Sequence, residues 1–160
     1  MKVTLIIYRL SWRILKGVRC NINRENTLKL RNSFTNLYPK WHPHYPNGHV
    51  LFRFECRDGW FQIIWDLSEK LEAEIIGRKA KNDLTTAKWS APHAVEVKEE
   101  YGKLSFYMSS YTNGISAAIK EADKRSEVTC EFCGAPGELR GDKWTYTLCE
   151  EHKDKKGSSK

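Results

Sequence analysis

The apolar residues of this chain recur every three or four positions in four stretches, a spacing typical of a helix with one buried face. They predict helices over residues 3–16, 26–38, 58–77 and 113–126. The third helix has the widest apolar side, with Asp58 predicted to cap its start and Gly77 to end it. Because Val3, Leu5 and Ile7 also alternate, a short strand is the alternative at the start of the first stretch.

Strands are predicted where apolar and polar residues alternate. The stretch VLFRFEC, residues 50–56, is one, and residues 94–108 form a hairpin that turns around Gly102. Val95 and Val97 are predicted to share one face of its first arm. Helices and strands together predict an α+β fold in which the helices pack on a small antiparallel sheet.

A stretch near the C-terminus, TCEFCGAPGELRGDKWTYTLCEEH, carries two close pairs of metal-ligand residue types. Two residues separate Cys130 from Cys133, fifteen residues follow, and two residues separate Cys149 from His152. Zinc takes four thiolate or imidazole ligands in a tetrahedron, and pairs at this spacing are a recognised zinc pattern. A disulfide pair would be the alternative in a secreted chain.

The residues between the ligand pairs predict a zinc ribbon. Gly134 directly follows the second cysteine and permits the left-handed turn of a knuckle. Gly141 and Asp142 are a two-residue hairpin signal between alternating apolar positions. Four protein ligands close the coordination sphere, whereas a catalytic zinc keeps one position for water. The prediction is therefore one structural Zn²⁺ without catalysis.

The length of 160 residues suits one domain with a small appendage. Asn26 can cap the second helix, and three prolines in residues 38–50 exclude regular structure there. The predicted organisation is a basic N-terminal helical extension over residues 1–25, an α+β core over 26–126, a zinc-binding module over 127–153 and a flexible tail over 154–160.

The net charge of +7 is concentrated in residues 1–57, which carry eleven Lys/Arg and two acidic residues. This asymmetry favours an anionic partner such as nucleic acid, although a solvated basic helix face would have the same composition. A basic amphipathic helix over residues 3–16 can also lie on a membrane surface. The apolar runs are shorter than the roughly 20 residues of a membrane span. With no cleavage-site pattern near the start, a cytoplasmic protein with reduced cysteines is predicted.

Basic and aromatic residues are mixed on the predicted zinc hairpin, at Arg140, Lys143, Trp144 and Tyr146. This mixture suits stacking and phosphate contacts with single-stranded nucleic acid, and it equally suits aromatic packing on the rest of the domain. The predicted contact surface for nucleic acid or another partner consists of Arg9, Arg13, Arg19, Arg24, Arg140, Lys143 and Trp144.

Other candidate sites have simpler alternatives. The sequence Asp58-Gly59-Trp60 suits either a binding turn or a helix cap with a core tryptophan behind it. The proline-rich loop suits either a second metal site or a surface loop, with its histidines at His42, His44 and His49. No Gly-rich phosphate loop, Ser–His–Asp set or nucleophile elbow is present, so no enzyme and no small-molecule substrate is predicted.

Three stretches, FECRDGWFQIIWDLSEKLE, VEVKEEYGKLSFYM and CEFCGAPGELR…LCEEH, occur in this order. Together they resemble a family of small proteins of bacteriophages and bacterial prophages, whose members carry GDGW before a helix, VKEKFGxLRFY, and CExCGxPGxLR…W…LCxxH. The resemblance spans residues 34–152 and implies a phage context and a zinc module at the four ligand positions named above. This chain departs from the pattern at Arg57, where Gly is usual, and at Ser105, where Arg is usual.

The first functional hypothesis is a non-enzymatic phage-type zinc-binding protein that binds nucleic acid through a basic surface, in the host cytoplasm if phage-encoded. The alternative is a protein-binding modulator or inhibitor of a host factor, such as a defence or nucleic-acid-processing complex. A net charge of +7 argues against mimicry of DNA, which requires an acidic surface.

Overall fold

The computed structural model describes residues 22–40, 52–81, 91–142 and 144–155. The helix predicted over residues 3–16 lies outside these ranges. So do several predicted site residues, namely Arg9, Arg13, Arg19, His42, His44, His49 and Lys143.

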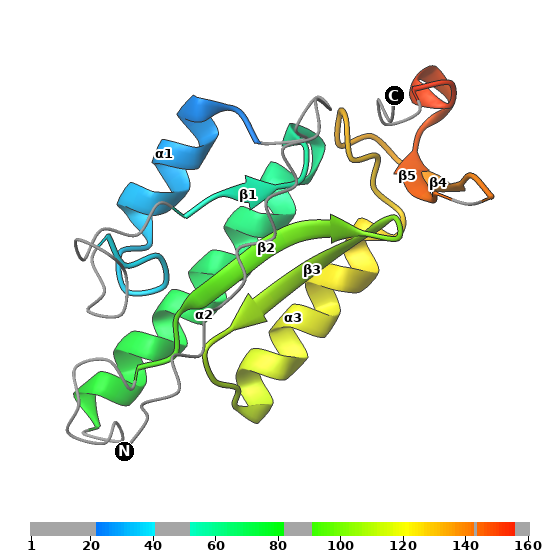
Figure 1. The fold of residues 1–160 in the computed structure, drawn as a ribbon. Helices are drawn as coiled ribbons and strands as arrows, with labels where there is room; N and C mark the ends of the chain where they lie inside the picture. Colours follow the sequence, from blue (N-terminus) through cyan, green and yellow to red (C-terminus); the bar gives the residue numbers. More distant parts are fainter. Residues whose placement is uncertain (1–21, 41–51, 82–90, 143, 156–160) are drawn as a thin grey trace, which may run out of the picture.

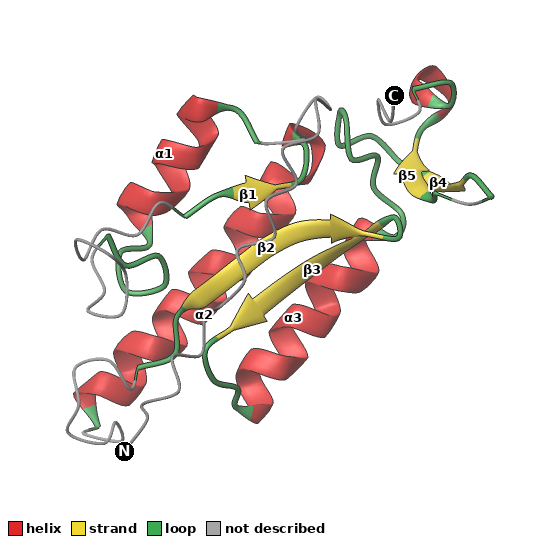
Figure 2. Ribbon diagram, viewed as in Figure 1, coloured by secondary structure: helices red, strands yellow, loops and turns green. Residues whose placement is uncertain are grey.

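Within the described residues, the chain forms three α-helices, a three-stranded sheet and a separate two-stranded hairpin (Figure 1). The helices are α1 (Arg24–Ser33), α2 (Phe61–Ala80) and α3 (Asn113–Ser126). The sheet has the order β1 (Phe54–Glu55), β2 (Ala94–Glu100), β3 (Lys103–Met108). The hairpin joins β4 (Glu138–Arg140) and β5 (Tyr146–Leu148). Two 3₁₀ turns are η2 (Asp58–Trp60) and η3 (Glu150–His152). Figure 2 shows this mixture of helices and strands, which confirms the α+β class.

The sheet is mixed, which corrects the prediction of an antiparallel sheet. β1 runs parallel to β2, with Phe54 opposite Val97, and β2 runs antiparallel to β3. Parallel neighbours need a long crossover connection, and α2 lies in the connection between β1 and β2. In Figure 1, α2 and α3 lie side by side across one face of the sheet. Both helices bury their apolar faces there.

The start of the β2–β3 hairpin also differs from the prediction. A β-bulge between Ala94 and Glu96 shifts the register of the first arm. Ala94 and Val97 therefore face the core, whereas Val95 is 50% exposed. A bulge places two residues opposite one, so strict alternation fails at this point.

β3 is an edge strand whose outward backbone groups are partly occupied by side chains. The Leu104 N–H donates to Ser126 Oγ at 2.9 Å, and the Met108 N–H donates to the Tyr111 hydroxyl at 3.1 Å. Ser126 ends α3, and Tyr111 lies in the connection from β3 to α3. Side chains from the end of α3 and from the segment before α3 therefore accept from backbone N–H groups near both ends of this edge strand.

Asp58 does not cap α2, which corrects its predicted role. It begins η2 and binds residues at the start of α1. Trp60 is the N-cap residue of α2 and makes no side-chain capping bond. Asp58 Oδ1 instead accepts from the Asn23 N–H at 3.1 Å and from Asn26 Nδ2 at 3.0 Å. Asn23, not Asn26, caps α1, because its Oδ1 accepts from the Asn26 N–H at 2.9 Å.

A buried carboxylate holds the segment after α1 against α2. Glu72 Oε2 accepts from the Leu37 N–H at 2.7 Å, and its Oε1 accepts from the Asn36 N–H at 3.1 Å and Asn36 Nδ2 at 2.6 Å. The next residue, Tyr38, is fully buried, and its hydroxyl lies 2.7 Å from Ser68 Oγ. Glu72 thus satisfies backbone donors that no helix or strand would satisfy.

Replacement of this carboxylate tests its role. Glu72→Ala is expected to destabilise the protein by about 2–4 kcal/mol, because buried backbone donors lose a charged acceptor. Glu69→Ala, on the exposed side of the same helix, is the matched control and is expected to change stability by less than about 0.5 kcal/mol. Urea unfolding measures both, and equal losses in the two variants would contradict the assignment.

Candidate metal centre

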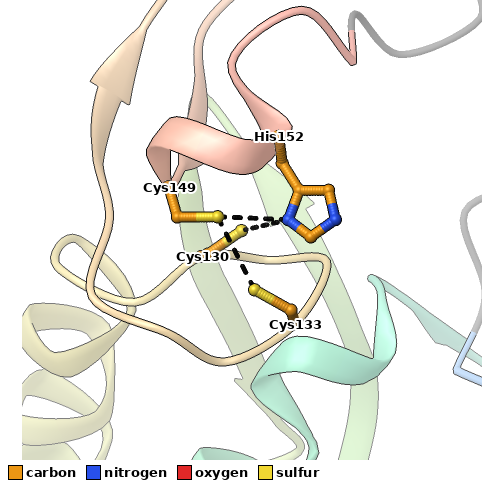
Figure 3. A group of neighbouring side chains, drawn as sticks. All are labelled: Cys130, Cys133, Cys149 and His152. Atoms are coloured by element: carbon orange, nitrogen blue, oxygen red, sulfur yellow. Dashed lines mark hydrogen bonds between the residues drawn. The ribbon is translucent and has the colours of Figure 1, made fainter.

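Three cysteines and one histidine meet beside the C-terminal hairpin. Cys130 and Cys133 lie in the loop after α3, Cys149 follows β5, and His152 ends η3. Their ligand atoms all lie within 4.8 Å of one another. In Figure 3, the four side chains point toward a common centre. The structure thus brings together the four residues whose spacing suggested a metal site, and their arrangement is consistent with one ion such as zinc.

Several distances between the ligand atoms are close to those expected around a tetrahedral ion. Bonds of about 2.3 Å to sulfur and about 2.0 Å to nitrogen place two sulfurs about 3.8 Å apart, and sulfur and nitrogen about 3.5 Å apart. Cys133 Sγ lies 3.7 Å from Cys149 Sγ. His152 Nδ1 lies 3.5 Å from Cys130 Sγ and 3.1 Å from Cys149 Sγ. Four protein ligands would fill the tetrahedron, which leaves no position for a substrate.

Gly134 closes the turn that directs the first two cysteines. Its φ of +79° is the left-handed conformation expected of a knuckle, and its N–H donates to the Cys130 carbonyl at 2.9 Å. Burial raises the pKa of Cys130, but backbone hydrogen bonds, first that from Cys149, lower this pKa to about 6. The loop therefore favours the thiolate, which is the form that binds a metal.

The hairpin between the ligand pairs has a longer loop than predicted. Residues 141–145 connect β4 to β5, in place of a two-residue turn at Gly141 and Asp142. Gly141 has a φ of +106°, and a Cβ there would lie 2.1 Å from the Trp144 carbonyl oxygen. Trp144 belongs to this tight loop and not to β5, and its side chain is 67% exposed.

The turn at η2 binds the metal-binding loop of the same chain. The Gly59 N–H donates to the Glu131 carbonyl at 2.8 Å, and Trp60 Nε1 donates to the Thr129 carbonyl at 2.7 Å. A Cβ on Gly59 would lie 2.3 Å from the Cys130 carbonyl oxygen, so the close approach requires glycine. Trp60 is fully buried, as expected from the interpretation that this turn places a tryptophan in the core. This turn holds the metal-binding loop of the same chain against the core.

The tip of the β2–β3 hairpin contacts another part of the same module. Thr147 Oγ1 donates to the Gly102 carbonyl at 2.6 Å, and the Thr147 carbonyl accepts from the Glu131 N–H at 3.0 Å. Gly102 approaches Leu139 so closely that an added Cβ would lie 2.3 Å from its Cδ1. The metal-binding loop is thus fixed both by η2 and by this hairpin tip. The segments of residues 54–72, 95–108 and 130–152 therefore meet at one place.

A stack of side chains links η2 to the histidine ligand. The Arg57 guanidinium carbon lies 3.9 Å from the centroid of the Phe132 ring, which stacks on His152 at 5.2 Å and 18°. Arg57 also faces the buried Glu131, with Nε 3.8 Å from Oε2. Burial raises the pKa of Glu131 to about 7, to which Glu99 contributes and which Arg57 opposes. Sequence reasoning missed Phe132, whose only signal was its place between two ligands.

Few of the predicted partner-contact residues can be placed. Arg24 is exposed in the first turn of α1. Arg140 is engaged within the module, since its Nη2 lies 2.6 Å from a Glu138 oxygen and 2.9 Å from a Glu150 oxygen. The pair with Glu150 links the hairpin to η3, which carries the histidine ligand. Arg140 therefore has a structural explanation that needs no partner.

The excess positive charge lies outside the described residues. The described ranges together carry 18 Lys/Arg and 19 Asp/Glu. Residues 1–21 alone carry five Lys/Arg and no acidic residue. The described surface is therefore close to neutral, and the net charge of +7 comes from the remaining residues.

Comparison with known proteins adds no further assignment. No protein-family model, curated protein or solved structure matches this chain. In the part of the chain that the structure describes, no helix combines the length and the apolar character required to cross a bilayer. Cys56 is fully buried, which suits a small apolar side chain at the end of a strand. The function is therefore argued from the geometry of the site.

Metal removal tests the centre directly. The purified chain is expected to contain one zinc ion, and chelation is expected to lower the Tm by about 10 °C or more, because metal binding and local folding are one event. Elemental analysis and calorimetry with and without a chelator measure these effects. Absence of bound metal, or a Tm that chelation leaves unchanged, would contradict a structural centre.

Two glycine variants test the close approach of η2 to the metal-binding loop. Gly59→Ala is expected to displace the loop, lower the Tm and speed metal release to a colorimetric chelator, since its Cβ would meet backbone oxygen at 2.3 Å. Gly77→Ala in α2 places its Cβ where no atom lies within 4 Å, and it is expected to stabilise by about 0.5–1 kcal/mol. Similar metal release from both variants would show that the close approach is unimportant.

Proposed function

We propose that the Cys₃His centre is a structural zinc site and that the protein acts by binding nucleic acid, without catalysis. Three thiolates and one imidazole are a ligand set that favours zinc over harder divalent ions. A closed four-ligand sphere suits an ion that holds a surface in place. The nucleic acid would then bind to the protein surface beside the metal centre.

The observation that carries the proposal is a pair of exposed aromatic side chains beside the metal module. Trp144 on the β4–β5 loop is 67% exposed, and Tyr101 at the β2–β3 tip is 77% exposed. Both line one groove of about 300 Å³. Aromatic rings presented in this way suit stacking of unpaired bases, which favours single-stranded nucleic acid.

Charge supports the same proposal from another part of the chain. The five Lys/Arg of residues 1–21 include Arg9, Arg13 and Arg19, and no acidic residue offsets them. Basic segments of this kind supply most of the affinity for phosphates. In this proposal, these residues contact the backbone of the nucleic acid while the aromatic groove receives its bases. If the resemblance to phage proteins holds, the place of action is the cytoplasm of the host.

A host protein is the second candidate partner. It is favoured by a groove of about 530 Å³ between β3 and α3, lined by Tyr107, Tyr111 and Ile119 among others. Tyr107 and Tyr111 are 40% and 54% exposed, so the groove offers apolar surface that the core does not use. Capture of a host protein from lysate after nuclease treatment, with no affinity for oligonucleotides, would favour this candidate.

Salt dependence tests the nucleic-acid proposal. Affinity for a single-stranded oligonucleotide is expected to fall about 10- to 100-fold between about 50 and about 200 mM salt, because bound phosphates release counterions. Fluorescence anisotropy with a labelled oligonucleotide measures the slope. No binding at about 50 mM salt, or an affinity that salt does not change, would overturn the proposal.

A matched set of charge variants locates the arginines that bind phosphate. Combined Arg9→Ala, Arg13→Ala and Arg19→Ala are expected to reduce the salt slope by about 2, because each phosphate that is no longer neutralised lowers the slope by about 0.7. The control removes the same charge from exposed lysines of the core, namely Lys81, Lys120 and Lys124. An equal effect of the two triple variants would point to net charge alone.

A further inference from the structure

We propose that the groove between the β2–β3 tip and the β4–β5 loop is a pocket for a single unpaired base, with Glu99 reading an exocyclic amino group. This inference rests on the nucleic-acid function proposed above and assigns its recognition site. The groove holds about 300 Å³, at the lower end of the range of about 300–1,000 Å³ found for small-ligand pockets.

The backbone at Tyr101 indicates that its ring is kept for a purpose other than folding. Tyr101 and Gly102 have φ values of 56° and 80°, the left-handed conformations of a two-residue type I′ turn. Asn or Gly is preferred at the first of these positions, and a bulky residue there is unfavourable. The ring is 77% exposed, so burial does not compensate this strain. Such outliers point to function when the fold does not need them.

Trp144 faces the same groove from the metal module. Its carbonyl oxygen lies where a Cβ on Gly141 would be 2.1 Å away, and its indole is 67% exposed. The two rings thus come from two hairpin tips whose relative position is fixed by the buried hydrogen bond from Thr147 to Gly102. Fixed hairpin tips reduce the conformational freedom that is lost when a base stacks on the two rings.

Glu99 supplies a hydrogen-bond acceptor in the same groove. Its Oε1 accepts from the Gly102 N–H at 2.7 Å, which fixes the carboxyl group. Its Oε2 makes no hydrogen bond to the residues that the structure describes, and Glu99 is one of the residues that line the groove. A carboxylate accepts from amino groups such as cytosine N4, and it repels phosphate. The groove therefore suits the base and not the backbone of a nucleic acid.

The remaining charges of the groove are already paired. Lys98 Nζ lies 2.9 Å from a Glu96 oxygen and 3.1 Å from a Glu100 oxygen. The Tyr107 hydroxyl donates to Glu100 at 2.6 Å. Glu99 and the aromatic rings are thus the groups that a ligand would meet, which favours a flat ring with an amino edge over a charged peptide.

The experiment compares single-residue variants of the full chain bound to zinc. Tyr101→Asn removes the ring but keeps a residue that the turn accepts, so the Tm is expected to stay at its wild-type value or above. Affinity for a cytosine 12-mer is expected to fall about 5- to 100-fold in Tyr101→Asn and in Trp144→Ala, with the salt slope unchanged. Ile76→Ala, which removes an exposed apolar side chain from α2, is the control and is expected to bind like the wild type.

The preference for cytosine over thymine tests the role of Glu99 as a hydrogen-bond acceptor. The wild type is expected to prefer a cytosine 12-mer to a thymine 12-mer by about 5-fold or more, since one hydrogen bond to a charged group is at stake. Glu99→Gln keeps an acceptor for the Gly102 N–H but replaces the free oxygen by a donor, so the preference is expected to disappear. Equal affinity of the wild type for both oligonucleotides would overturn the role of Glu99.

The failures of the two proposals are distinguishable. If the wild type binds no oligonucleotide at low salt, the nucleic-acid function itself fails. If the wild type binds with the expected salt slope but Tyr101→Asn and Trp144→Ala bind equally well, the function stands and the base pocket is overturned.

Discussion

The hydrogen bond from the Gly59 N–H to the Glu131 carbonyl sets the metal-binding loop on the core. It exists only because residue 59 lacks a Cβ, since any side chain there would overlap the Cys130 and Glu131 carbonyl oxygens. The loop in turn places Thr147 against the hairpin tip at Gly102. Ligand geometry, the position of the β4–β5 loop and the groove beside it therefore all depend on one close backbone approach.

This dependence explains how a small module of short strands is kept in one position. A hairpin with strands of three residues is marginally stable in water on its own. Here it is held by a four-ligand centre, by ion pairs from Arg140 and by docking on two turns of the core. Arg57 of the core lies on the Phe132 ring, and Phe132 stacks on the metal ligand His152. The core therefore contacts a ligand side chain through one aromatic ring. Core and module are coupled through direct packing against the metal ligands.

The bounds of α3 and the four ligands were predictable because their signals are local, whereas α1 ends at Ser33 before the predicted residue 38 and α2 continues past Gly77 to Ala80. The 3.6-residue period located α3 at residues 113–126, and ligand spacing identified the four residues of the centre. The parallel pairing of β1 was missed although the order strand, helix, strand before the hairpin is typical of a crossover. The bulge at Ala94 and the longer β4–β5 loop depend on packing partners distant in sequence, so local patterns could not reveal them. The same holds for Gly59 and Tyr101, whose roles come from tertiary packing and backbone angles that the letters alone do not encode.

The edge of β3 has a consequence for the behaviour of the molecule at high concentration. A three-stranded sheet with an open edge could recruit a strand from another copy of the chain. Ser126 and Tyr111 occupy the outward N–H groups of Leu104 and Met108, which leaves only a short run of free backbone between them. A run of that length is too short to template a new strand. The side chains that close this edge thus act against intermolecular strand pairing and aggregation, at the side of β3 where no strand of the described residues pairs with it.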